Sequence, residues 1–122
     1  MKASTSTHNG KKYLHITRSS YTDLDDVKAS RKNIIPLFQD LGIERFLSDC
    51  RNINFDDVSS IELDILAKDL KSDFPSCNKV AVLCEPDSLN LFQHYENLGA
   101  NNNLDVQLYS ELESAKSWLC ES

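Results

Sequence analysis

Lys79-Val80-Ala81-Val82-Leu83-Cys84 contains the longest apolar run of the sequence, from Val80 to Cys84. A run without polar alternation is typical of a strand that is covered on both faces of a parallel sheet. It is far shorter than the roughly 20 apolar residues that span a bilayer. The run therefore predicts the central strand of a buried sheet, and nothing in the sequence predicts membrane insertion.

Other strands are predicted on both sides of this run. Residues 13–18 and 104–109 alternate apolar and polar side chains, which is the period of a half-buried strand. A further short strand is predicted over 45–50. Apolar residues at three- and four-residue spacing predict four helices, over 22–42, 59–75, 87–99 and 110–122, with capping-box pairs at Ser59/Glu62 and Ser110/Glu113 and helix ends at Gly42, Pro75 and Gly99.

Strands that alternate with helices indicate βαβ crossovers. The predicted fold is a single α/β domain over residues 13–122, with an about four-stranded, mostly parallel sheet and helices packed on it. Residues 1–12 are polar and are predicted to be a flexible leader. They lack the apolar stretch of a secretory signal, so we expect a cytoplasmic protein.

Charge and composition restrict the function. The 122 residues carry a net charge of −6, and the only basic runs are Lys11-Lys12 and Arg31-Lys32. Nucleic acid is not expected as a partner, because phosphate neutralisation requires clustered Lys and Arg. The three glycines are not clustered, so a glycine-rich phosphate loop is absent.

No catalytic constellation is visible, and we expect neither an enzyme nor a bound cofactor. None of the three histidines has an obvious nucleophile partner in the sequence. The four cysteines form no CxxC pair and are interpreted as small buried residues. Acidic pairs such as Asp25-Asp26 suit helix N-termini better than a metal site, so no metal site is predicted.

Pro36 lies inside the first predicted helix, where a proline removes a backbone hydrogen bond and clashes with the preceding turn. We expect a kink near Lys32. A kinked helix could cover an apolar pocket lined by Ile34, Ile35 and Phe38. The same residues could equally be ordinary core residues.

The segment Asn54-Phe55-Asp56-Asp57-Val58-Ser59-Ser60-Ile61-Glu62-Leu63-Asp64-Ile65-Leu66 follows a strand and opens a helix. It resembles the switch segment of STAS domains, the SpoIIAA-like fold of anti-sigma factor antagonists. Ser59-Ser60 and the apolar residues after them match that motif, whereas Val58 and Ile61 replace its aspartate and glycine. The segments 47–51 (Leu-Ser-Asp-Cys-Arg) and 115–119 (Ala-Lys-Ser-Trp-Leu) also fit the outline of uncharacterised SpoIIAA-like proteins.

This resemblance implies a non-catalytic regulatory or protein-interaction module. It places a switch or partner-binding site at Asp56, Asp57, Ser59 and Ser60. Phosphorylation of a serine there and simple capping of the helix by Ser59 are both compatible with the sequence. The alternative function is a carrier or sensor of a small apolar, lipid-like ligand held between helix and sheet.

Overall fold

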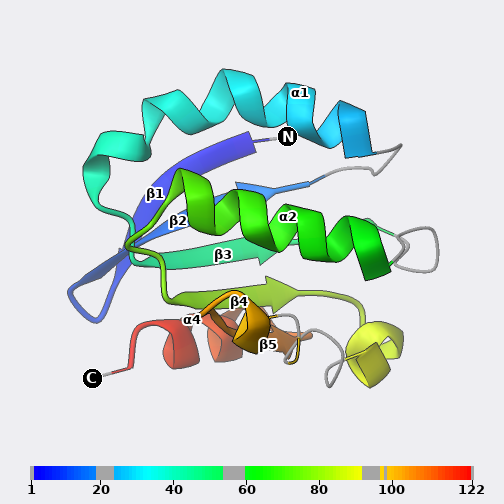
Figure 1. Cartoon of the computed structure of the whole chain (residues 1–122). Coiled ribbons are helices and arrows are strands. Elements are labelled where there is room, and N and C mark those ends of the chain that lie inside the picture. Colours follow the sequence, from blue (N-terminus) through cyan, green and yellow to red (C-terminus); the bar gives the residue numbers. More distant parts are fainter. Residues whose placement is uncertain (1, 19–23, 54–59, 92–96, 98, 122) are drawn as a thin grey trace.

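The computed structural model describes residues 2–18, 24–53, 60–91, 97 and 99–121. Within these residues the chain forms a five-stranded sheet with strand order β1-β2-β3-β4-β5 (Figure 1). β1 is antiparallel to β2, and the other three strand pairs are parallel. The predicted mostly parallel α/β sheet is confirmed, with one more strand than predicted. The strands are β1 Lys2–His8, β2 Lys11–Thr17, β3 Arg45–Asp49, β4 Lys79–Leu83 and β5 Asp105–Tyr109.

The predicted flexible leader over residues 1–12 is corrected by β1. Asn9 and Gly10 have φ values of 52° and 74°, the left-handed conformation that a two-residue type I′ hairpin requires. The register is continuous from Lys2↔Thr17 to His8↔Lys11. A polar segment therefore forms an ordered edge strand, because its backbone groups pair with β2 and its side chains do not need to enter the core.

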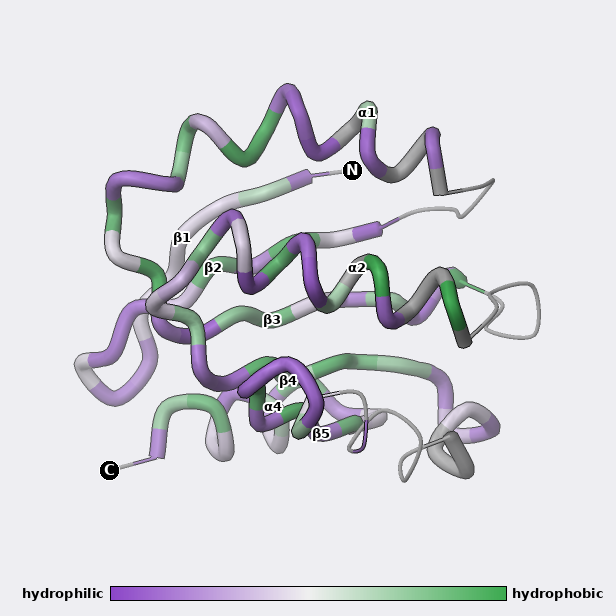
Figure 2. The backbone as a smooth tube through the Cα atoms, viewed as in Figure 1, coloured by the Kyte–Doolittle hydropathy of each residue, from purple (hydrophilic) through white to green (hydrophobic). Residues whose placement is uncertain are grey.

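β3 and β4 are covered on both faces. Phe46 and Val80 belong to one buried cluster, whereas the neighbouring Leu47 and Ala81 belong to another. Figure 2 shows the hydrophobic residues gathered along these central strands, whereas the β1–β2 turn is hydrophilic. The prediction that the run after Lys79 forms a central, doubly buried strand is confirmed.

The described helices of the three crossover connections lie on one face of the sheet, which we call the α1–α2 face (Figure 1). Helix α1 spans Leu24–Ile34 and α2 spans Ser60–Asp73. Residues 97 and 99–101 are also helical, and Gly99 among them packs on this face against Val106. Successive right-handed crossovers that advance in one direction place their helices on the same side.

Helix α4, Leu112–Leu119, covers the opposite face, which we call the α4 face. Ala115 and Leu119 are fully buried there, and Leu112 and Trp118 pack beside them, as predicted. The predicted capping box at Ser110 is wrong, because the N-cap is Glu111 and it makes no side-chain cap. No helix in the described part of the chain is long and apolar enough to cross a membrane.

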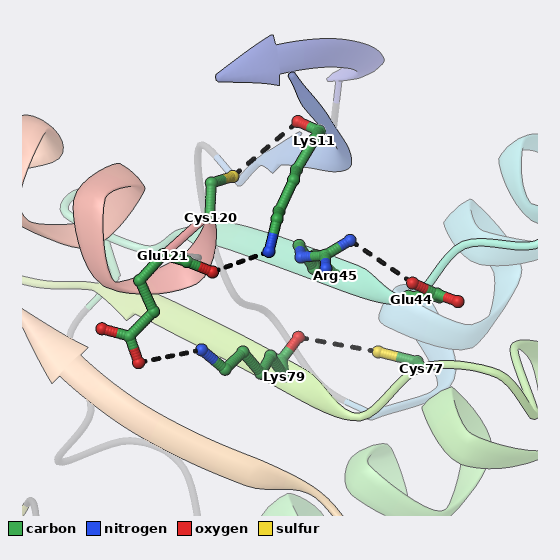
Figure 3. A network of polar contacts seen from close by, with 7 residues as sticks. All are labelled: Lys11, Glu44, Arg45, Cys77, Lys79, Cys120 and Glu121. Atoms are coloured by element: carbon green, nitrogen blue, oxygen red, sulfur yellow. Dashed lines mark hydrogen bonds and ion pairs between the residues drawn. The ribbon is translucent and has the colours of Figure 1, made fainter. Parts of the chain in front are cut away.

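The last turn of α4 is held at the end of the sheet where the parallel strands begin (Figure 3). Lys79 Nζ donates to the Trp118 carbonyl at 3.1 Å, lies 3.3 Å from the Glu121 carboxylate and lies 4.7 Å from the centre of the Trp118 ring. Lys11 Nζ donates to the Glu121 carbonyl at 2.8 Å. These contacts fix the only helix that covers the α4 face in the described structure.

Pro36 ends α1 instead of kinking it. The α-helix continues through the predicted kink at Lys32 and gives way to the 3₁₀ helix η1, Ile35–Leu37. A second 3₁₀ helix, η2 Gln39–Leu41, leads to Gly42 at φ 62°, so the predicted end at Gly42 is confirmed. A proline is tolerated in a first turn, where its missing N–H has no partner to lose.

Gly99 lies inside a helical turn, and the prediction that it ends the helix is wrong. Before it, η4 is a 3₁₀ helix over Pro86–Leu91. A Cβ at Gly99 would lie 2.6 Å from Val106 Cγ2 and 2.7 Å from the Leu104 carbonyl oxygen. Glycine is required there because the helix approaches β5 closely, not because the chain turns.

Gly99→Ala is expected to destabilise the fold by about 1–3 kcal/mol, because the Leu104 backbone cannot move away without disturbing β5. Urea unfolding measures the change. Ala100→Ser, at the exposed neighbouring position, is the control and should change stability little. Equal stability of Gly99→Ala and the natural chain would contradict the close packing.

Candidate functional site

The parallel strands β2 to β5 end at one edge of the sheet, which we call the carboxyl edge. Arg18, Arg51, Glu85 and Ser110 follow these strands there. Figure 1 shows α2 beginning at the end toward which the β3 and β4 arrows point. In open α/β sheets, ligands bind in the crevice outside the carboxyl ends of the strands. The carboxyl edge is therefore the candidate site.

Asp49 and Arg51 form the best-defined polar contact at this edge. Arg51 Nε donates to Asp49 Oδ1 at 3.0 Å, and its terminal nitrogen Nη2 donates to Oδ2 at 2.8 Å. The Arg51 backbone N–H also lies 3.3 Å from Oδ1. Hydrogen bonding to Arg51 lowers the pKa of Asp49. The pair fixes the chain as it leaves β3 toward the predicted switch segment.

His15 lies beside this pair on the α4 face. Its neighbours Leu14 and Ile16 point into the core under α1 and α2, so alternation directs His15 to the opposite side. Its Nε2 atom is buried and has no hydrogen-bond partner. Desolvation lowers the pKa of His15 more than nearby Asp49 raises it, and Lys116 and Arg51 lower it further.

Two thiols occupy the buried side of the carboxyl edge. Cys50 and Cys84 follow β3 and β4, and both pack into the core under α1 and α2. Burial raises the pKa of the Cys84 thiol to about 11, and it also raises that of Cys50, whose sulfur lies 3.2 Å from Ser48 Oγ. Thiols of high pKa are protonated at neutral pH and are poor nucleophiles. All four cysteines are free and buried, which fits their predicted packing role.

The predicted switch residues Asp56, Asp57 and Ser59 lie outside the described residues, as does the Ser59 cap. Ser60 is the first residue of α2, so the predicted helix start agrees with the structure to within one residue. Ile61 follows it and is 75% exposed. A large apolar side chain is thus presented to solvent at the first turn of α2.

A groove of about 320 Å³ lies between α1, η1 and α2. Of the predicted pocket residues, Ile35 lines it, whereas Phe38 packs against the core and Ile34 is half-buried. Most of its lining residues have charged ends, with ion pairs Arg31–Asp73 at 2.9 Å and Lys28–Asp69 at 3.8 Å, whereas the surface of the wall itself is mainly apolar. The apolar pocket at Ile34, Ile35 and Phe38 and an apolar ligand stay predictions. The lining residues are Lys28, Arg31, Lys32, Ile35, Pro36, Gln39, Asp69 and Asp73.

Three features of the site were not predicted from the sequence: the exposed Ile61, the buried ring of His15 and the Asp49–Arg51 contact. The first two had a signal in the sequence. The stripe from Leu63 to Phe74 leaves Ile61 off the buried side of its helix, and the alternation of β2 separates His15 from Leu14. The Asp49–Arg51 contact had none, because residues two apart at a strand end meet only when the chain turns. No group of three or more His, Cys, Asp or Glu side chains suited to a metal is found in the described part of the chain.

No protein-family model and no curated protein matches the chain. Among solved structures it is similar to an uncharacterised protein of the DUF3478 family from Shewanella loihica PV-4, which has a SpoIIAA-like fold. The TM-score is 0.56 at 13% sequence identity, and the match covers 98% of this chain and 93% of the other. The chain has a SpoIIAA-like fold, as the resemblance implied.

Asp49→Asn should destabilise the protein at pH 7 by about 1 kcal/mol. This is the contribution expected of a charged hydrogen-bonded pair, reduced for solvent screening because the Arg51 side chain is 44% exposed. Since the pKa of Asp49 is lowered in the fold, its contribution is present above the ordinary Asp pKa and is lost as pH falls through the folded value. Urea unfolding from pH 7 to pH 3 measures this. A stability gap between the two proteins that is as large at pH 3 as at pH 7 would contradict it.

His15→Gln should weaken the loss of stability on acidification. The lowered pKa means that the unfolded chain binds the proton more readily, so stability falls as pH drops below the ordinary His value of about 6.5. NMR titration of the His15 ring should give a pKa below that value, and urea midpoints between pH 7.5 and 5 should fall less in the variant. His8→Gln is the matched control and should retain the His15 effect.

Proposed function

We propose that the protein is a non-catalytic interaction module that binds a partner protein at the carboxyl edge, through the first turn of α2. The exposure of Ile61 carries this proposal. The residues before it, Asp56, Asp57, Ser59 and Ser60, are proposed to contact the same partner. The resemblance to the STAS switch segment supports the placement. A cytoplasmic location stays a prediction.

The proposed contact has an apolar centre and a charged surround. Burial of an isoleucine side chain contributes about 1.5–3 kcal/mol, enough to make Ile61 an anchor. At the same edge of the sheet, Arg51 and Glu85 are exposed, and Asp64, one turn after Ile61 on α2, is paired with Lys68 at 2.8 Å. Interfaces between proteins commonly combine a small apolar core with a polar rim.

The site offers little support for catalysis. The Asp49 carboxylate is occupied by Arg51, and burial keeps the neighbouring Cys50 and Cys84 thiols protonated. A general base needs a pKa near the working pH and a reachable proton, and a nucleophile needs an activating partner. These residues instead stabilise the strand ends from which α2 departs.

Ile61→Asp should abolish partner binding, because it places a charge in the apolar centre of the contact. Leu37→Asp is a matched control, since Leu37 is 72% exposed on η1, away from the first turn of α2. The natural chain and both variants are immobilised, and captured proteins are quantified by mass spectrometry. The expected partner is retained by the natural chain and by Leu37→Asp and is depleted about tenfold or more by Ile61→Asp.

Circular dichroism and urea unfolding check that both variants remain folded. Both positions are exposed, so stability should change little. If every captured protein binds Ile61→Asp as well as the natural chain, the contact does not use this turn of α2 and the proposal fails.

A further inference from the structure

We propose that the outer edge of β1 binds an extended, acidic peptide segment of a partner protein as an added strand of the sheet. This edge lies four strands away from β5 and is separate from the first turn of α2. Strand addition derives affinity from main-chain hydrogen bonds and specificity from alternate side chains.

The hairpin geometry identifies the backbone groups that face outward. In a two-residue hairpin the residues next to the turn, His8 and Lys11, form a hydrogen-bonded pair, and such pairs then alternate along the ladder. The Arg18 N–H donates to the Asp49 carbonyl at 3.0 Å, so the even-numbered residues at the end of β2 face β3, as this alternation requires. The outward N–H and C=O groups of β1 therefore belong to Ala3, Thr5 and Thr7.

This edge is open in the described part of the structure. No described backbone hydrogen bond outside the β1–β2 ladder involves residues 2–8. Thr5 and Thr7 are exposed, and neither a proline nor a bulge interrupts the seven-residue register. Proteins commonly protect exposed strand edges from further pairing with prolines, bulges or charged residues, and of these β1 has only Lys2.

The charge of the hairpin selects an acidic occupant. Residues 1–18 contain four of the chain's thirteen Lys and Arg residues and none of its nineteen Asp and Glu residues. Lys11 is engaged by the Glu121 carbonyl (Figure 3), whereas Lys2 and Lys12 are exposed and form no ion pair among the described residues. A chain of net charge −6 thus presents a basic edge strand.

Side-chain spacing makes the expected ligand more specific. Lys2 and His8 lie on the same face of β1, six residues apart, which is about 20 Å along a strand. An added strand would meet them at non-hydrogen-bonded positions, where opposite side chains are closest. A segment with acidic residues six positions apart and β-branched residues between them fits this edge.

A second copy of the chain is a poorer occupant. Antiparallel pairing of two β1 strands centred on Thr5 would place Lys2 of each copy opposite His8 of the other, with no acidic side chain in either hairpin. Such a pair lacks the opposite charges that an acidic segment would place across from Lys2, and opposite-charge pairs are among the contacts that stabilise neighbouring strands.

The test uses the acetylated and amidated peptide Glu-Thr-Val-Thr-Val-Thr-Glu, followed by NMR titration of the full chain. Binding should shift and protect the amides of Ala3, Thr5 and Thr7. Replacing both Glu by Lys, or methylating the backbone nitrogens of the second, fourth and sixth residues, should each weaken binding about tenfold or more, because each removes a different component of the contact.

Thr5→Pro should weaken binding by a similar factor. Because the Thr5 N–H faces outward, the proline removes a docking donor and leaves the β1–β2 ladder intact. Thr5→Val retains the N–H and should bind like the natural chain, and Ile61→Asp should also bind normally. The methylated peptide tests the same bond should Thr5→Pro fail to fold.

Three outcomes would overturn this proposal. One is the absence of amide shifts in β1 at roughly 1 mM peptide, a concentration that detects even weak complexes. Another is equal binding of the acidic and methylated peptides, which indicates charge attraction without strand addition. The third is dimerisation of the free chain that Thr5→Pro abolishes, which assigns the edge to a second copy.

Discussion

In the described part of the chain a single short helix, α4, is the only helix on one sheet face, and much of the molecule follows from this constraint. The eight residues of α4 form a rod about 12 Å long, whereas neighbouring strands are about 4.8 Å apart. The helix packs on β3, β4 and β5 and leaves most of that side of β1 and β2 without a helix. Side chains there are accordingly polar or half-polar, with Ser4, Ser6 and His15 in place of core residues.

The same constraint explains which elements the sequence could predict. β3 and β4 lie between two layers, so their apolar runs are uninterrupted, and the stripe of α4 has one face to bury. β1 carries no such pattern, since neither of its sides enters a core fully. Its signal was the Asn9-Gly10 turn, a strong indication of a type I′ hairpin that is local and independent of hydrophobicity.

The site was predictable only where a single element decides it. The start of α2 and the resemblance of its first turn to a STAS switch could be identified from local sequence, and the fold match agrees with that resemblance. The α1–α2 groove depended on contacts such as Arg31–Asp73, between residues 42 positions apart, so its ion pairs could not be derived from the helical stripe around Ile35. Gly99 was misinterpreted for a related reason, because its requirement comes from Val106 on another element.

Net charge is an average, and the fold separates its components. The overall −6 argued against a nucleic-acid partner, yet the charged Lys and Arg side chains of the hairpin, residues 1–18, have no acidic side chain among them. Nucleic acid remains a weaker explanation of that surface than a peptide. Affinity for a phosphate backbone grows with the number of cations released against it, and the hairpin offers two exposed lysines with Lys11 already engaged. Ala3, Thr5 and Thr7 instead present backbone donors and acceptors alternately, at strand spacing. Another extended main chain can pair with all of these groups. Phosphates only accept hydrogen bonds, so they would leave the outward carbonyl groups unpaired.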